Sequence, residues 1–118
     1  MRRAGRAPIW RAMTEAETRA EELDRLRTAW RAAVGERLPD LARVRPEWPI
    51  RLDHCFSRVI LDAVHGRPWR EVLRAPAWRN MDAATLRRAI ALAEDIADGR
   101  ADLEALNRRS LVLRGEPR

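Results

Sequence analysis

Three side chains that could do chemistry follow one another at four-residue steps near the middle of the chain: His54, Arg58 and Asp62. On a helix this spacing places them on one face, where they can interact. Histidine titrates near neutral pH and arginine holds carboxylates or phosphates, so these residues, with Asp53, are candidates for an acid/base or anion-binding site. The alternative interpretation is an Arg58–Asp62 ion pair on a solvated face, with His54 exposed or packed on a neighbouring helix.

Arginine and tryptophan are interspersed in residues 65–81, "HGRPWREVLRAPAWRNM". Indole faces stack on bases or accept guanidinium groups, and arginines bind phosphates, so this segment is a candidate surface for an acidic partner, either nucleic acid or acidic protein. Its candidate binding residues are four arginines for charge and one tryptophan for stacking: Arg67, Arg70, Arg74, Arg79 and Trp78. Alternatively, Trp69 and Trp78 cover the core and the arginines extend over it into water.

Other chemistries find no support in the residue types. Cys55 is the only cysteine, and because it adjoins His54, the two side chains point about 100° apart on a helix and do not pair. We expect Cys55 to be a small buried thiol. Two histidines without HExxH or CxxC spacing predict no metal site, and five widely separated glycines exclude phosphate-binding loops. No cofactor is expected.

The first half of the chain predicts one long helix and a connector. Thr14 and Glu17 form a capping-box pattern, and apolar residues follow at three- and four-residue steps from Leu23 to Leu38. Gly35 or Pro39 is expected to end this helix. The stretch "LPDLARVRPEWPI" contains three prolines, so we expect it to be mostly irregular.

The second half predicts further helices. Apolar residues from Leu52 to Ala63 mark a central helix that stops at Gly66, and Pro68 opens a short helix that Pro76 prevents from continuing. Asp82 caps a long helix ending at Gly99, and "ADLEALNRRSL" forms the last one, so residues 82–111 are expected to form an αα-hairpin. The fold class is all-α: a single domain of four to five helices over 14–118, preceded by a flexible basic arm, 1–13.

Composition limits the range of functions. The 118 residues are 46% hydrophobic, which supports a packed core. All 24 basic residues are arginine, a bias that GC-rich coding explains, and the formal net charge is +6. The positive excess lies in residues 1–13, which contain four arginines and no acid, and in residues 39–80, so a polyanion would be attracted there. Neither a signal peptide nor a membrane span is apparent, so a cytoplasmic location is expected.

Three segments carry a resemblance to a known group: "RLDHCFSRVILDAV", "RAPAWRNM" and "LAEDIADGRADLEALNRRSLVLRG". Over about residues 50–115 the chain resembles small bacterial proteins that are identified as GNAT-related N-acetyltransferases. The resemblance implies an acetyltransferase or an accessory to one. His54 and Arg58, supported by Asp53 or Asp62, are the best candidates for that work.

Three functional hypotheses therefore remain. The first is a non-enzymatic interaction module that binds an acidic partner through residues 67–79, joined by the N-terminal arm and by Arg51 and Arg58. The second is the acetyltransferase-related activity that the resemblance implies. The third is a subunit of an obligate homo-oligomer, in which the apolar stripes of two copies complete each other.

Overall fold

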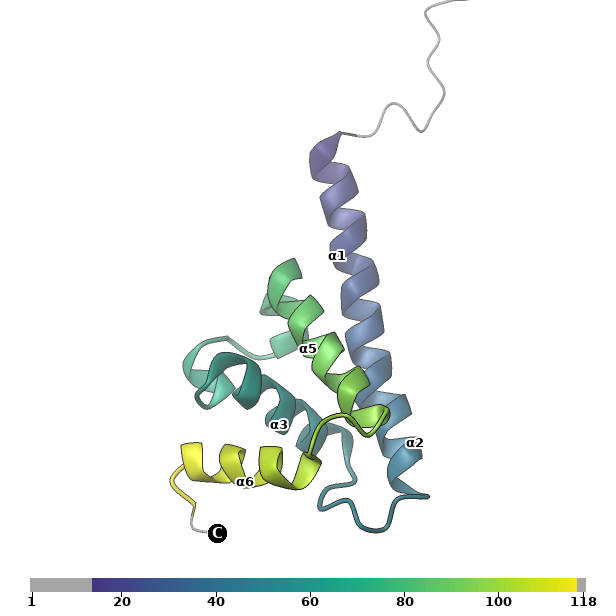
Figure 1. Ribbon diagram of the computed structural model, residues 1–118. Coiled ribbons are helices and arrows are strands. Elements are labelled where there is room, and N and C mark those ends of the chain that lie inside the picture. The colour runs from purple at the N-terminus through teal and green to yellow at the C-terminus, as the bar shows by residue number, and fades with distance from the viewer. Residues whose placement is uncertain (1–13, 117–118) are drawn as a thin grey trace, which may run out of the picture.

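A computed structural model describes residues 14–116, and every regular element in that range is a helix (Figure 1). The long helices are α1 (Glu15–Ala32), α3 (Asp53–His65), α5 (Ala83–Ala97) and α6 (Leu103–Leu113). The predicted all-α fold is thus confirmed, whereas the predicted arm, 1–13, lies outside the described residues. None of the described helices has the length and apolar character needed to cross a membrane.

Helix α1 begins as its sequence predicts. The Thr14 hydroxyl accepts a hydrogen bond from the Glu17 backbone N–H (3.1 Å), and the Glu17 carboxylate accepts one from the Thr14 N–H (2.8 Å). The first turns are exposed and project beyond the other helices (Figure 1), and Trp30 is the first fully buried residue of the helix. The helix therefore packs on the rest of the protein only from about Glu22, which pairs with Arg87, onward.

The end of α1 differs from the prediction. Neither Gly35 nor Pro39 stops the helix: it passes through a π-helical segment, η2 (Ala33–Arg37), into α2 (Leu38–Ala42). Proline lacks an N–H, and its ring collides with the carbonyl four residues earlier in a regular α-helix. The wider π turn directly before Pro39 gives that ring room. The predicted irregular connector consequently begins only after Ala42.

The π turn also keeps one face of this helix on the core. Trp30, Val34, Leu38 and Ala42 are all buried, although they follow one another at steps of four residues. In a regular α-helix such steps drift by about 40° each, or about 120° over three steps. The π segment has more residues per turn, which offsets this drift. All four side chains can therefore pack against the same neighbours.

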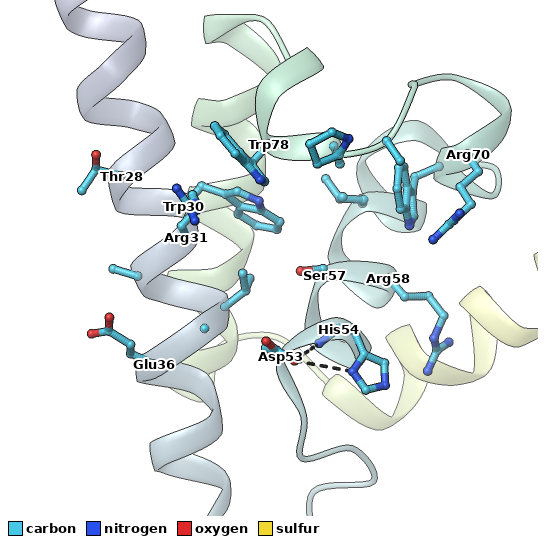
Figure 2. Close-up of a pocket in the computed structure, with 18 of the residues that line it drawn as sticks. Thr28, Trp30, Arg31, Glu36, Asp53, His54, Ser57, Arg58, Arg70 and Trp78 are labelled. Carbon is cyan, nitrogen blue, oxygen red and sulfur yellow. Dashed lines mark hydrogen bonds and ion pairs between the residues drawn. The ribbon is translucent and has the colours of Figure 1, made fainter.

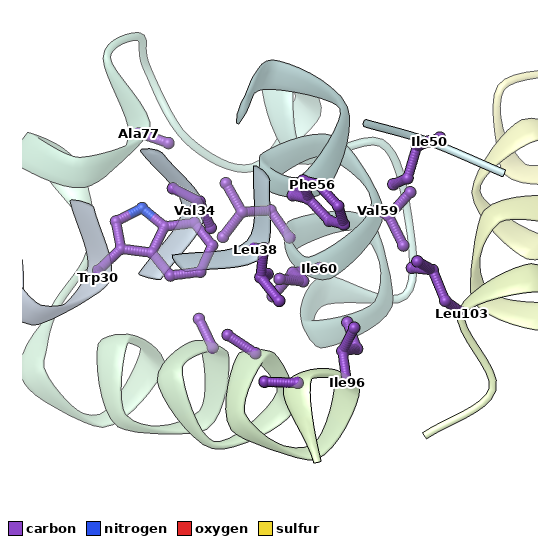
Figure 3. Close-up of a cluster of buried hydrophobic side chains, with 14 of the residues drawn as sticks. Trp30, Val34, Leu38, Ile50, Phe56, Val59, Ile60, Ala77, Ile96 and Leu103 are labelled. Atoms are coloured by element: carbon purple, nitrogen blue, oxygen red, sulfur yellow. The ribbon is translucent and has the colours of Figure 1, made fainter. Parts of the chain in front are cut away.

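Helix α3 lies at the centre of the fold and packs against η2, α5 and α6. Phe56, Val59 and Ile60 have no exposed surface and meet Leu38 from α2 in the main hydrophobic cluster (Figure 3). The helix ends at Gly66, whose φ of 71° lies in the left-handed region that glycine adopts without steric cost. The prediction for this helix is confirmed.

The segment between α3 and α5 is less regular than predicted. Instead of a short α-helix after Pro68, it forms one 3₁₀ turn, η3 (Trp69–Glu71). A second short helix that the sequence did not predict, α4 (Ala77–Asn80), follows Pro76. The side chain of Asn80 donates to the carbonyls of Arg74 and Pro76, which closes this turn on itself.

Helices α5 and α6 occur where the sequence predicts them. Asp82 caps α5 by accepting from the Thr85 N–H (2.8 Å), and this hydrogen bond lowers the pKa of Asp82. Asp102 caps α6 in the same way by accepting from the Ala105 N–H (3.1 Å). The two helices are joined at Gly99, but α6 turns away and packs mainly on α3 rather than along α5 (Figure 1). Both helices of the predicted αα-hairpin, residues 82–111, are therefore present, but they do not pack against each other as that hairpin requires.

Candidate functional site

An open groove of about 900 Å³ lies between the first helix and α3 (Figure 2). One wall is formed by the end of α1 and by η2, the floor by α3, and the remaining edges by η3, α4 and Arg114 just after α6. The side chains that give the groove its character are three tryptophans, four arginines, two carboxylates and a histidine: Trp30, Trp69, Trp78, Arg31, Arg58, Arg70, Arg114, Glu36, Asp53 and His54.

The groove combines two sets of residues that the sequence separates. His54, Arg58 and Asp53 from the acid/base hypothesis line it, and so do Arg70 and Trp78 from the arginine–tryptophan segment. Because four arginines face two carboxylates, its lining is net positive. Such a surface attracts an anion that also has apolar or aromatic parts.

Guanidinium groups lie over two of the indoles at the groove. The Arg31 guanidinium carbon lies 4.4 Å from the centre of the Trp78 ring, and that of Arg70 lies 4.9 Å from the centre of the Trp69 ring. Arg79 approaches Trp78 as well, at 5.2 Å. Both tryptophans are half-buried and pack against the core, so they cover the core and contribute to the groove at once.

Asp62 differs most from the prediction. It neither lies on a solvated face nor pairs with Arg58, because its side chain is fully buried. Its two oxygens accept hydrogen bonds from Ser110 Oγ (2.6 Å), from the Trp69 backbone N–H (2.8 Å) and from two nitrogens of Arg114 (2.7 and 3.1 Å). Asp62 does not line the groove. It is therefore a structural residue that ties α6 and η3 to α3.

Arg58 belongs to the same polar network but faces the groove. Its terminal nitrogens donate to Ser110 Oγ and to Asn107 Oδ1, both at 2.8 Å. Ser110 thus links Arg58 to Asp62 by accepting from one and donating to the other. Among the described residues, these two bonds leave other N–H groups of Arg58 without a partner, so a fixed guanidinium can still bind an anion.

Arg114 is the second fixed cation of the groove. Its hydrogen bonds to Asp62 raise its pKa, so it remains charged. Two arginines are thus held in place from α6 and α3, whereas Arg31 and Arg70 are exposed and reach the groove over indole rings.

His54 and Asp53 lie at the start of α3, beside the groove (Figure 2). His54 Nδ1 is 3.5 Å from Asp53 Oδ1, and both side chains are exposed. Asp53 also accepts from the His54 backbone N–H (2.7 Å). Cys55 is half-buried rather than fully buried as expected. Within residues 14–116, no group of three His, Cys, Asp or Glu side chains is arranged to hold a metal ion.

The structure divides the five candidate partner-binding residues. Arg70 and Trp78 line the groove, whereas Arg67, Arg74 and Arg79 do not. Arg67 forms an exposed ion pair with Glu71 (3.2 Å), which reduces its availability for a partner. Arg74 is exposed and forms no ion pair with any described residue. The candidate surface is therefore centred on the groove rather than on residues 65–81 as a whole.

Several groove residues were not identified from the sequence. Arg31 and Glu36 lie on the first helix, next to core positions, and Arg114 lies beyond the last apolar position of α6. Local spacing shows only that these residues follow or precede buried ones. Their convergence depends on how α1 and α6 pack around α3, which no local pattern reports.

Comparisons with known proteins add nothing to this geometry: no protein-family model, curated protein or solved structure matches the chain.

Proposed function

We propose that the protein is a non-enzymatic interaction module that holds an acidic partner in the groove between α1 and α3. The observation that supports this function is the concentration of Arg31, Arg58, Arg70 and Arg114 around one recess of about 900 Å³. A recess of this size lies within the range of ligand sites, about 300–1,000 Å³. The two fixed guanidinium groups reduce the entropy lost when an anion binds.

A titration with labelled polyanions tests this function. Fluorescence anisotropy would be measured for an oligonucleotide and for a polyglutamate peptide at about 50 and 200 mM salt. The test variant is Arg31→Ala/Arg70→Ala, which removes two exposed groove cations. The matched control, Arg43→Ala/Arg109→Ala, removes the same charge from exposed positions outside the groove.

We expect salt-sensitive binding of at least one polyanion, weakened about tenfold or more in the groove variant and much less in the control. Equal weakening in both variants would mean that only net charge matters. In that case, or if neither polyanion binds at the lower salt, the proposed function is wrong.

The second candidate function is the acetyltransferase-related activity implied by the resemblance. The observation in its favour is the position of His54, Asp53 and Arg58 at one end of the groove. Its test is acetyl-CoA binding by calorimetry, followed by an assay for release of free CoA thiol when a primary amine is supplied to accept the acetyl group. Thiol release that is lost in His54→Gln while acetyl-CoA still binds would favour this candidate over a module without catalysis.

A further inference from the structure

The groove carries carboxylates as well as arginines, and this mixture restricts what can occupy it. We propose that the occupant is single-stranded nucleic acid, with its phosphates on the arginines and its bases against the tryptophan–arginine pairs. This inference rests on the proposed function, because it uses the same groove. It adds the chemical class of the partner.

The first argument is the pairing of guanidinium with indole. The guanidinium carbon of Arg70 lies 4.9 Å from the centre of the Trp69 ring, and that of Arg31 lies 4.4 Å from the centre of the Trp78 ring. Proteins that bind single strands stack bases on aromatic rings and on guanidinium planes. An extended acidic peptide has no comparable flat group, so it would use the charge of these residues and leave their planar faces unused.

The second argument is the arrangement of the fixed cations. Arg58 is anchored by Asn107 and Ser110, and Arg114 is anchored by Asp62, and both reach the same groove. Guanidinium groups held by other hydrogen bonds keep their remaining donors in a fixed direction, which suits phosphate oxygens.

The third argument concerns Glu36 and Asp53. Both line the groove, so the carboxylate side chains of an acidic peptide, which only accept hydrogen bonds, meet repulsion there. Bases differ from acidic side chains in this respect, because their amino groups donate to carboxylates, as cytosine N4 does to Asp or Glu. The two carboxylates therefore disfavour polyglutamate more than they disfavour a strand with exposed bases.

The recess favours a single strand over a duplex. Proteins that recognise a DNA duplex insert a helix or a β-ribbon into one of its grooves, so their contact residues project outward from the protein surface. In this structure the contact residues surround a hollow between α1 and α3 (Figure 2). Bases that are stacked inside a duplex cannot enter such a hollow, whereas the unpaired bases of a flexible strand can.

The experiment uses the full chain and four labelled probes of matched length, about ten units. These are a mixed-sequence single-stranded oligonucleotide, the same backbone with abasic sites, a duplex of the same sequence, and polyglutamate. The single strand and its abasic form carry the same phosphate charge, so their difference in affinity measures the contribution of the bases. The variants are Trp78→Leu and Arg31→Ala/Arg70→Ala, with Arg43→Ala/Arg109→Ala as the charge control.

We expect the single strand to bind at least about tenfold more tightly than its abasic form, because only the single strand has bases to stack on the aromatic and guanidinium planes. Trp78→Leu should reduce this ratio. Arg31 and Arg70 also supply two of the positive charges that neutralise phosphates. Arg31→Ala/Arg70→Ala should therefore make the negative slope of log K against log salt shallower by about 1.4, or about 0.7 for each lost phosphate contact. If Trp78→Leu fails to fold, the affinities of the unmodified protein for the base-bearing and the abasic strand still test whether the bases contribute to binding.

Other outcomes separate the two proposals. If polyglutamate binds most tightly and depends on Arg31 and Arg70, the interaction module stands and the nucleic-acid inference is overturned. Equal affinity for the base-bearing and abasic strands, or tighter binding of the duplex, also overturns the inference. If no probe binds, both proposals fail.

Discussion

Replacing Asp62 by asparagine should strongly destabilise the fold. The buried carboxylate accepts hydrogen bonds from Ser110, from the Trp69 backbone and from two nitrogens of Arg114. Both of its oxygens are surrounded by donors. The amide of an asparagine replaces one of these oxygens with an NH₂ group, which itself donates and therefore faces the donors already present. The change also removes the charge that neutralises Arg114.

The size of the effect follows from burial. Removing one partner of a buried ion pair costs about 3–5 kcal/mol, because the other charge is left uncompensated. The Arg114 side chain is 24% exposed and that of Asp62 is 0% exposed, so water can compensate for only part of the loss. A domain of this kind has a free energy of unfolding of about 5–15 kcal/mol, so the variant should lose a large share of it.

Urea unfolding followed by tryptophan fluorescence measures this loss. The matched control is Asp95→Asn, since Asp95 also pairs with an arginine, Arg100, at 2.9 Å, but on the surface. Exposed pairs contribute about 0–1 kcal/mol, so the control should lie close to the unmodified protein. If Asp62→Asn loses no more free energy of unfolding than Asp95→Asn, the structural role assigned to the buried network is incorrect.

Three further predictions follow from the helices. Asp82→Ala removes the N-cap of α5 and should lower the free energy of unfolding by about 1 kcal/mol in urea titrations, whereas Asp82→Ser, which retains a capping oxygen, should lose less. Burial lowers the pKa of His65, so the unfolded chain takes up this proton before the folded protein does, and the free energy of unfolding should decrease as the pH falls through about 6.5, the ordinary pKa of histidine. Urea midpoints should show a smaller drop for His65→Gln; an equal drop would exclude His65 as the cause. Leu38→Ala should cost about 2–5 kcal/mol in the same assay, because Leu38 is fully buried, and Leu52→Ala, at a position 57% exposed, serves as a control expected to stay near zero.

Local signals in the sequence predicted most of the helices. Thr14, Asp82 and Gly66 each act through neighbours within a few residues, so their roles can be read from a short window. Pro39 is the exception, because its usual effect assumes a regular α-helix before it. The helix before Pro39 is a π segment instead, and no residue pattern around Gly35 predicts a π turn.

The groove was only partly predictable for a different reason. Asp62 stands four residues after Arg58, so helical spacing suggested that they pair. Its actual partners, Ser110 and Arg114, lie 48 and 52 residues further along the chain. Arg31 comes from yet another helix. Side-chain identity and spacing identified His54, Arg58, Arg70 and Trp78 as candidates, but only the packing of helices on α3 decides which of them share a site.

The π segment has a consequence for how this chain tolerates insertions and deletions. A π turn is equivalent to one extra residue in an α-helix, so deleting one residue from Ala33–Arg37 would allow the stretch to close into regular α-helix. Leu38 and Ala42 would still face the core, because a π turn absorbs one extra residue without changing the orientation of the helix that follows it. The regular α-helix so formed would bring the ring of Pro39 against the carbonyl four residues before it. The extra residue of the π segment is therefore needed for Pro39 rather than for the orientation of the buried side chains.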